Sequence, residues 1–286
     1  MSFCCNALLV NNTDTDPEYI KNGAIECLFC KRMFEIRDGI VIFLIKHKLD
    51  HHSSHEAELR DHQAHSYDKD FDPSTVQEKK EMIPTLSALE PLKDKTVLEL
   101  GCGTGRYTLP ILEKCRNLVA VDFSLESLRI LARKLSSNRS VGLICADISN
   151  FKCLESSFDM VFSTLTSNLP SYEHRRVMYL LAKRAMNRGG SFVLSAHYYN
   201  FRLRLTGIKQ SGYYRQSGIY RYIFKERELR KEIREFFRLH TIQLIQVVLP
   251  GKFKIGLHNS LIFSLIISYI PIFNIFASLI LIKARH

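Results

Sequence analysis

The stretch from Thr96 to Asp122 constrains the fold of this chain more than any other. A short apolar run leads into three glycines at every second position, then a helical pattern, then a second apolar run ending in Asp122. This order predicts a strand, a glycine loop, a helix and a strand. Glycines let a backbone approach a ligand closely, the helix start offers unpaired N–H groups, and an acid at a strand end suits a ribose. The stretch therefore predicts a nucleoside site.

The spacing of the glycines excludes two common nucleotide sites. A dinucleotide fingerprint needs glycine at the first, third and sixth positions, but the sixth position is Arg106. A P-loop needs a Gly-Lys-Ser/Thr ending, which is missing here. What remains is acid-x-Gly-x-Gly-x-Gly, with Glu99 as the acid and Asp122 placed 21 residues after Gly101. The alternative is an unrelated βαβ unit with a glycine turn.

This pattern resembles motif I of the class I methyltransferases that depend on S-adenosylmethionine (SAM), a family that includes the enzymes of ubiquinone and menaquinone biosynthesis. The resemblance implies that the loop positions the methionine part of SAM, that Glu99 lies near its amino group and that Asp122 binds the ribose. Asp147 would meet the adenine, with Ile148 beside the ring. The cofactor-binding residues implied in this way are Tyr67, Glu99, Gly101, Cys102, Gly103, Gly105, Asp122, Phe123, Asp147, Ile148 and Ser163.

Alternating strand and helix patterns predict an α/β fold with a parallel, doubly wound sheet. The resemblance implies a Rossmann-like sheet of seven strands, mostly parallel, in a domain spanning residues 67–286. Its last strand, 277–283, would be antiparallel and pair with 242–249. Helices are expected over 76–89, 124–135 and 172–187, and further strands over 141–146, 158–162 and 191–196.

Residues 1–45 are expected to form a separate, small β-ribbon module. Cys27 and Cys30 form a CxxC pair before an apolar hairpin that turns at Asp38-Gly39. The segment resembles the zinc-ribbon-like segment ahead of some methyltransferases, although adjacent Cys4 and Cys5 replace its first CxxC. These four cysteines are the candidate zinc ligands. The alternative is a ribbon held by its apolar hairpin, without metal.

Residues 46–66 are polar and rich in histidine, which favours a solvated linker or a short surface helix. On a helix His51 and His55 would share a face, as a metal site requires. The following Tyr67-Asp68 resembles the family's Tyr-Asp motif in a helix lying over the cofactor. Tyr67 is therefore a candidate lid residue, or else a tyrosine at the edge of the core.

The chain is strongly basic, with a formal charge of +11 and a pI near 9.3, so anionic partners are expected: nucleic acid, a lipid surface or a phosphorylated substrate. In residues 201–240 eight arginines and three lysines stand against four glutamates. The resemblance places a substrate-recognition cover at 201–239. Just before it, His197 is the candidate general base; the alternative is a structural histidine at a strand end.

No charged side chain lies between Lys254 and Lys283, but Pro271 divides this apolar stretch. An apolar helical insertion is expected over 257–273. It would enter a membrane interface or cover an acyl chain. A transmembrane anchor and a buried helix are the alternatives.

These features predict a SAM-dependent methyltransferase that acts on a small lipid-like or quinone-like acceptor at a membrane surface. An RNA base methyltransferase is the first alternative, because the protein is basic and begins with a cysteine ribbon. A SAM-binding protein without methyltransferase activity is the second. Cysteines scattered through the core and the absence of a secretory signal pattern favour the cytoplasm, with or without peripheral membrane contact.

Overall fold

The computed structural model describes residues 8–12, 20–28, 30–44, 49, 51–135, 140–153, 155–166, 169, 171–215, 217–247 and 261–286. Its strands are β1 (Leu8–Asn12), β2 (Gly23–Cys27), β3 (Met33–Arg37), β4 (Ile40–Ile42), β5 (Thr96–Leu100), β6 (Asn117–Asp122), β7 (Val141–Cys145), β8 (Phe158–Thr164), β9 (Met186–His197), β10 (Ser211–Tyr213), β11 (Tyr220–Tyr222), β12 (Arg238–Val247) and β13 (Ala277–Arg285). Its helices are α1 (His51–Asp70), α2 (Val76–Leu89), α3 (Thr108–Leu112), α4 (Leu125–Leu135), α5 (Tyr172–Ala185), α6 (Phe201–Leu205), α7 (Glu226–Arg234), α8 (Leu261–Ser268) and the 3-10 helix η4 (Pro271–Phe276).

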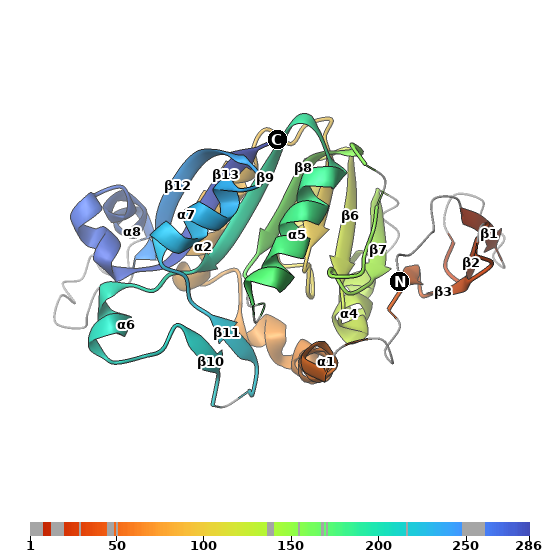
Figure 1. The fold of residues 1–286 in the computed structure, drawn as a ribbon, viewed down its shortest axis with the longest axis horizontal. Coiled ribbons are helices and arrows are strands. Elements are labelled where there is room, and N and C mark those ends of the chain that lie inside the picture. The colour runs from red at the N-terminus through yellow and green to blue at the C-terminus, as the bar shows by residue number, and fades with distance from the viewer. Residues whose placement is uncertain are drawn as a thin grey trace.

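One large sheet organises the described residues, in the order β1-β2-β3-β4-β7-β6-β5-β8-β9-β13-β12 (Figure 1). The strands from β7 to β9 pair in parallel, and β13 pairs antiparallel with both β9 and β12. The strand order reverses at β5, because β6 lies on one side of it and β8 on the other. In open α/β sheets ligands bind beyond the carboxyl ends of the strands at such a reversal.

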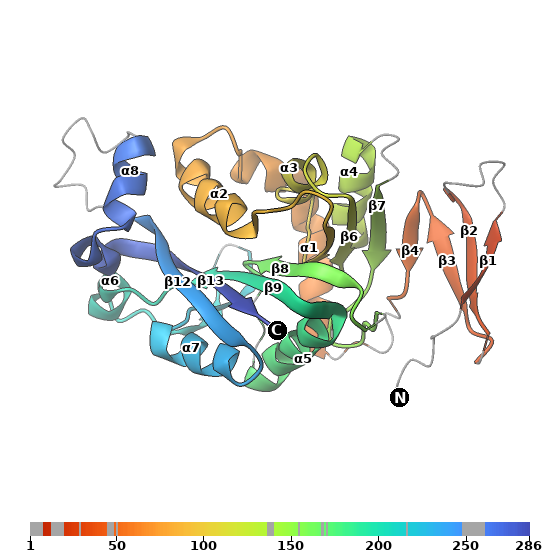
Figure 2. The ribbon, with the colours of Figure 1, turned by 90° about the horizontal axis from the view of Figure 1, so that it is seen from above.

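Both faces of the sheet are covered by helices. Successive side chains of a strand point to opposite faces, so Leu98 and Leu100 enter one core and Val97 enters the other. Helices α5 and α7 cover the first face, and α2, α3 and α4 cover the second (Figure 2). The prediction of a doubly wound α/β fold with a C-terminal antiparallel strand is confirmed.

The sheet has eleven strands where seven were expected, because the N-terminal ribbon joins it. Strand β4 pairs in parallel with β7, with Ile40 opposite Leu143. The Ile40 side chain is fully buried and packs in the main core. A smaller cluster of Ile25, Phe34 and Ile36 holds the rest of the ribbon together. Since an edge strand presents unpaired backbone groups, β7 offers a ready partner for β4. The ribbon strands therefore extend the main sheet. The expected boundary at residue 45 lies outside the described residues and stays a prediction.

The histidine-rich segment is a helix and not a linker. Helix α1 runs for 20 residues, continues beyond residue 66 and packs against α4. Ala57 and Ala64 are buried in this contact. The helix has no apolar stripe, so its sequence carries no helical periodicity, and its position depends on polar contacts described below.

The C-terminal region matches its predicted strand but not the full predicted helix. Strands β12 and β13 pair antiparallel as expected. Helix α8 covers eight residues and is followed by η4, which begins at Pro271. Residues 257–260 of the predicted insertion lie outside the described residues. In the described part of the chain no helix is both long and apolar enough to cross a membrane.

A buried ion pair ties the basic cover to the core. Two guanidinium nitrogens of Arg175 on α5 donate to the Glu232 carboxylate on α7, at 3.0 and 2.6 Å. The Tyr179 hydroxyl donates to the same carboxylate at 3.1 Å. The guanidinium carbon of Arg175 lies 4.4 Å from the ring centroid of Tyr222 and 5.0 Å from that of Phe224. Both charged side chains are less than a tenth exposed, so each depends on the other for charge compensation.

We expect Arg175→Ala to lower the free energy of unfolding by about 3–5 kcal/mol, because it leaves the Glu232 carboxylate buried without a cation. Urea denaturation measures this. The matched control is Arg230→Ala, which breaks a partly exposed i,i+4 ion pair with Glu226 within α7. It should lower the free energy of unfolding by about 0.5 kcal/mol or less. Equal losses in both variants would contradict this interpretation of the cover.

Candidate functional site

The glycine loop leaves open space at its centre. Gly101, Gly103 and Gly105 all have positive φ angles, of 79°, 53° and 93°, which side-chain-bearing residues rarely adopt. A Cβ atom on Gly101 would lie 2.2 Å from the Thr166 hydroxyl, and one on Gly105 would lie 2.4 Å from a Leu131 methyl. A Cβ on Gly103 would meet nothing within 4 Å. Two of the glycines are thus required by packing, and the third faces a space large enough for a ligand to approach the backbone.

Asp122 holds this loop from the end of the neighbouring strand. Its carboxylate accepts hydrogen bonds from the backbone N–H groups of Gly103 and Ser124, both at 2.8 Å. Burial raises the pKa of Asp122, and the backbone donors counteract part of the rise. The structure therefore brings an acid directly to the central glycine, as the sequence predicts for a ribose-binding carboxylate.

Glu99 is a fully buried carboxyl group near Asp122. It accepts a hydrogen bond from the Thr108 hydroxyl at 2.6 Å. Burial raises the pKa of Glu99 to about 8, and the negative charge of Asp122 adds to the rise. A ligand ammonium group beside it would favour the ionised form. An acid on the central glycine and a second buried acid nearby suit a ligand that carries both a sugar and an ammonium group.

The loop offers no free cation for a phosphate. Arg106, at the position where a dinucleotide site has glycine, donates to Glu81 at 2.9 Å and also pairs with Glu78, both on α2. All three side chains are largely buried in this contact. Arg106 therefore ties the loop to α2.

The remaining predicted cofactor residues lie around the same strand ends. Ser163 is buried and donates to the Leu100 carbonyl at 2.8 Å, so it supports the loop from below. Asp147 accepts from the Ser149 N–H and the Asn150 side chain, both at 2.9 Å, and so orders its own turn. Ile148 packs at the edge of the core. Cys102 is buried within the loop, and the carbonyl of Phe123 accepts from the Cys145 thiol at 3.8 Å.

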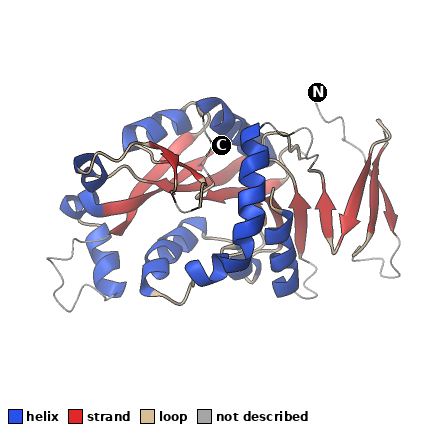
Figure 3. Ribbon diagram, turned by 90° about the horizontal axis from the view of Figure 1, so that it is seen from below, coloured by secondary structure: helices blue, strands red, loops and turns tan. Residues whose placement is uncertain are grey.

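Helix α1 lies across the site and carries Tyr67. Viewed from below, this long helix passes in front of the sheet (Figure 3). Its Asp68 accepts from the Thr104 hydroxyl of the loop at 2.7 Å, and Lys134 donates to the same carboxylate. Its Asp61 accepts from the Ser124 hydroxyl at 2.7 Å. Burial raises the pKa of Tyr67, whose ring packs on Phe71. Asp61 was missed by sequence reasoning, because a single acid in a polar segment carries no signal.

His197 ends β9 beside a cavity of about 270 Å³ on the acceptor side of the sheet. Burial lowers the pKa of His197 to about 4, and the positive charges of Arg221 and Arg60 lower it further. Its imidazole is therefore neutral at physiological pH. A neutral ring accepts a hydrogen bond, although so low a pKa makes it a weak general base. Arg60 also acts electrostatically on Asp122, so it lies between the two ends of the site.

The predicted zinc site is described only in part. Cys27 is buried and Cys30 is exposed, and the Cys30 N–H donates to the Cys27 sulfur at 3.5 Å. Cys4 and Cys5 lie outside the described residues. Within the ranges that are described, no three His, Cys, Asp or Glu side chains gather closely enough to hold a metal ion. Zinc binding remains a prediction.

Comparison with known proteins identifies the kind of domain. Residues 97–190 match the family model of a methyltransferase domain. Phosphoethanolamine N-methyltransferase 1 of Arabidopsis thaliana is 28% identical over 73% of this chain and 40% of that protein. Ribosomal RNA small subunit methyltransferase A of Dichelobacter nodosus is 37% identical over 24% of this chain and 27% of that protein. The chain therefore spans well under two thirds of the length of these relatives.

Solved structures support the same fold. Phosphoethanolamine N-methyltransferase 2 of Haemonchus contortus, solved in complex with SAM, superposes with a TM-score of 0.54 at 14% identity, over 79% of this chain and 57% of that chain. At this identity the similarity establishes the fold alone. The matched domain and the fold are those of the SAM-dependent methyltransferases.

We expect Gly103→Ala to weaken SAM binding by about tenfold or more, because the added methyl group enters the open space where the backbone would meet the ligand. Isothermal titration calorimetry measures the affinity. Gly189→Ala is the matched control, since Gly189 also has a positive φ and open space around it but lies at the start of β9, away from the loop. Each variant should lose about 1 kcal/mol of stability. Equal SAM affinity in both would refute the placement of the cofactor at Gly103.

Proposed function

We propose that this chain, with its SAM-dependent methyltransferase domain, transfers a methyl group from SAM to a small lipid-like acceptor at a membrane surface. The observation that carries this proposal is the open space at Gly103, whose N–H donates to the Asp122 carboxylate, together with the cavity beyond the end of β9. A quinone-like acceptor, as in the ubiquinone-type enzymes, is the second version of the same proposal.

In this proposal the cofactor supplies an activated methyl group on a positively charged sulfur. The glycine loop positions the methionine part, and Glu99 receives its ammonium group. Asp122 binds the ribose hydroxyls, while Asp147 and Ile148 hold the adenine. Tyr67 and α1 close the site from above and exclude water. Because methyl transfer is an in-line displacement, alignment of the acceptor with the methyl group and exclusion of water contribute most of the rate enhancement that the protein supplies.

His197 would act on the acceptor in this scheme. It lies at the end of β9 and within the cavity. As a neutral imidazole it accepts a hydrogen bond from an acceptor hydroxyl or amine and so orients the nucleophile. A full proton transfer to His197 is disfavoured by the same burial and positive charges that lower its pKa.

An exposed apolar patch supports the membrane part of the proposal. Helices α6 and α8 both contact η4. Six large apolar side chains on these elements and the short turn between them are more than half exposed, which is unusual for a surface that faces only water. They are Phe201, Leu205, Ile262, Ile266, Tyr269 and Ile272. Arg202 and Arg204 on α6 border the patch and would face anionic lipid headgroups.

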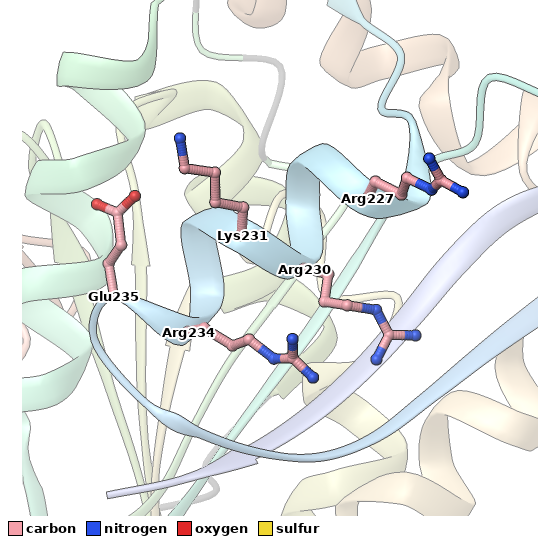
Figure 4. Close-up of a pocket in the computed structure, with 5 residues that line it drawn as sticks. All are labelled: Arg227, Arg230, Lys231, Arg234 and Glu235. Carbon is pink, nitrogen blue, oxygen red and sulfur yellow. The ribbon is translucent and has the colours of Figure 1, made fainter.

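RNA is the alternative acceptor. A hollow of about 340 Å³ lies along one side of α7 and is lined by Arg227, Arg230, Lys231, Arg234 and Glu235 (Figure 4). Such a cationic helix face suits a phosphate backbone, and the ribosomal RNA methyltransferase of D. nodosus is among the relatives. The cysteine ribbon adds to this alternative. The second alternative is a SAM-binding protein without methyltransferase activity.

The proposed activity is tested by incubating the protein with methyl-labelled SAM and a cell extract. We expect label in the organic-soluble fraction and none in RNA. Asp122→Asn is the negative control, because it removes the charge that is proposed to hold the ribose while keeping the size of the side chain. Label in RNA alone would establish the alternative, and no label in any fraction would leave only the inactive SAM-binding protein.

We expect the double variant Leu205→Asp, Ile266→Asp to bind anionic phosphatidylglycerol vesicles about tenfold more weakly or worse, because it places two charges in the apolar patch. Vesicle co-sedimentation measures this. Val177→Asp on α5 is the control, since Val177 is also an exposed apolar residue but lies on another element. Unchanged binding of the double variant would show that the patch does not contact lipid.

A further inference from the structure

The charged side chains that line the acceptor-side cavity are all positive. Its walls come from the end of β9, from β11, from α6 and from the start of β13. Arg221 and Arg202 contribute guanidinium groups, and Tyr198, Tyr214 and Asn200 contribute neutral polar groups. No aspartate or glutamate lines it in the described part of the chain. A volume of about 270 Å³ suits a small headgroup.

Arg221 is the centre of this charge. Its Nε atom is buried and has no hydrogen-bond partner, and no described carboxylate pairs with its guanidinium group. The guanidinium carbon lies 5.1 Å from the ring centroid of Tyr214, which orients the side chain without neutralising it. The buried guanidinium groups of Arg106 and Arg175, in contrast, each have a carboxylate partner. A buried donor without a partner is unfavourable, and a bound anion would offset this.

The fold holds Arg221 firmly in this place. Strand β11 pairs with β10, with Arg221 opposite Gly212. The Phe224 N–H, just after β11, donates to the His197 carbonyl at 2.8 Å. On the other side the Tyr220 N–H donates to the Glu56 carboxylate of α1 at 3.2 Å. Arg221 is therefore fixed between β9 and α1, the two elements that carry His197 and Tyr67.

We propose that Arg221, assisted by Arg202, binds a phosphate group of the methyl acceptor in this cavity. A guanidinium fork donates two parallel hydrogen bonds to phosphate oxygens, and the tyrosine hydroxyls complete the donor set. A phosphate held there leaves the rest of the acceptor beside His197, at the carboxyl ends of the strands where the glycine loop lies. The inference rests on the proposed methyl transfer and favours a phosphorylated, lipid-like acceptor over a quinone-like one. The phosphate belongs either to a soluble phosphomonoester or to a phospholipid headgroup.

The test is a calorimetric titration of the full chain, saturated with S-adenosylhomocysteine, with O-phosphoethanolamine and with inorganic phosphate. Vesicles of phosphatidic acid in phosphatidylcholine form the lipid arm. We expect Arg221→Gln to weaken binding of the phosphate probe by about tenfold or more, and Arg221→Lys to weaken it less. Arg188→Gln is the control: it removes an exposed arginine at the start of β9, which lines neither the cavity nor the hollow on α7, and it should bind like the wild type. Binding of the soluble probes identifies a phosphomonoester acceptor, and binding of the vesicles alone identifies a phospholipid.

A second measurement uses only the wild-type protein. Phenylglyoxal modifies accessible arginines, and mass spectrometry identifies which ones. The phosphate probe should protect Arg221 and leave the exposed Arg188 reactive. The proposal would be overturned if the probe protects both arginines equally, if both Gln variants lose phosphate binding equally, or if the wild type binds neither the soluble probes nor the vesicles. It would also be overturned if only a short RNA oligonucleotide protects Arg221.

The affinity for S-adenosylhomocysteine, measured in parallel, distinguishes failure of the proposed methyl transfer from failure of the proposed phosphate site. If the wild type does not bind the cofactor product, the proposed function fails, whereas phosphate binding at Arg221 is still decided by the protection experiment. If cofactor affinity is unchanged in Arg221→Gln while phosphate binding is lost, the variant is folded and the phosphate subsite is established.

Discussion

The site depends on keeping two carboxyl groups, Glu99 and Asp122, close together inside the protein. Burial disfavours ionisation and raises the pKa of both, and the negative charge of Asp122 adds to the rise at Glu99. The Thr108 hydroxyl and two backbone N–H groups offset part of this cost. A ligand that brings a positive charge and hydroxyl donors to these carboxylates would offset the rest of the free-energy cost of ionising them. The glycines allow the loop its positive φ angles, and with them the Gly103 N–H reaches Asp122.

Polar contacts between distant segments complete the enclosure. Helix α1 is fastened to the loop through Asp68 and to the start of α4 through Asp61. The cover is fastened to α5 by the Arg175–Glu232 pair, whose partners are 57 residues apart in the sequence. Such contacts require defined geometry, so they fix the lid and the cover at single positions over the strand ends, whereas a purely apolar contact would allow them to slide.

The acceptor side combines two surfaces that share the same elements. Leu203 on α6 and Phe276 on η4 line the cavity, while Leu205 and Ile272 on the same elements belong to the exposed apolar patch. In the proposed function an amphiphilic acceptor would keep its apolar part at the patch and place its headgroup in the cavity. In the same proposal Arg204 on α6 would face the membrane surface, and Arg221, assisted by Arg202, would receive the headgroup inside the cavity.

The sequence by itself determined the α/β core, because apolar runs, glycines at positive φ and strand-end acids are local requirements. It predicted β7, β8, β13 and α2 closely, and it placed Glu99, Asp122 and Gly103 at one site. Tertiary structure alone decided that β4 extends the main sheet, since this requires β4, already paired with its hairpin partner β3, to meet the distant strand β7. It also decided that 51–70 is a helix, because polar contacts and not an apolar stripe dock it. Arg221 was one basic residue among eleven in the cover, and only the fold leaves it partly buried without a described carboxylate partner, since charge pairing depends on which side chains meet in space.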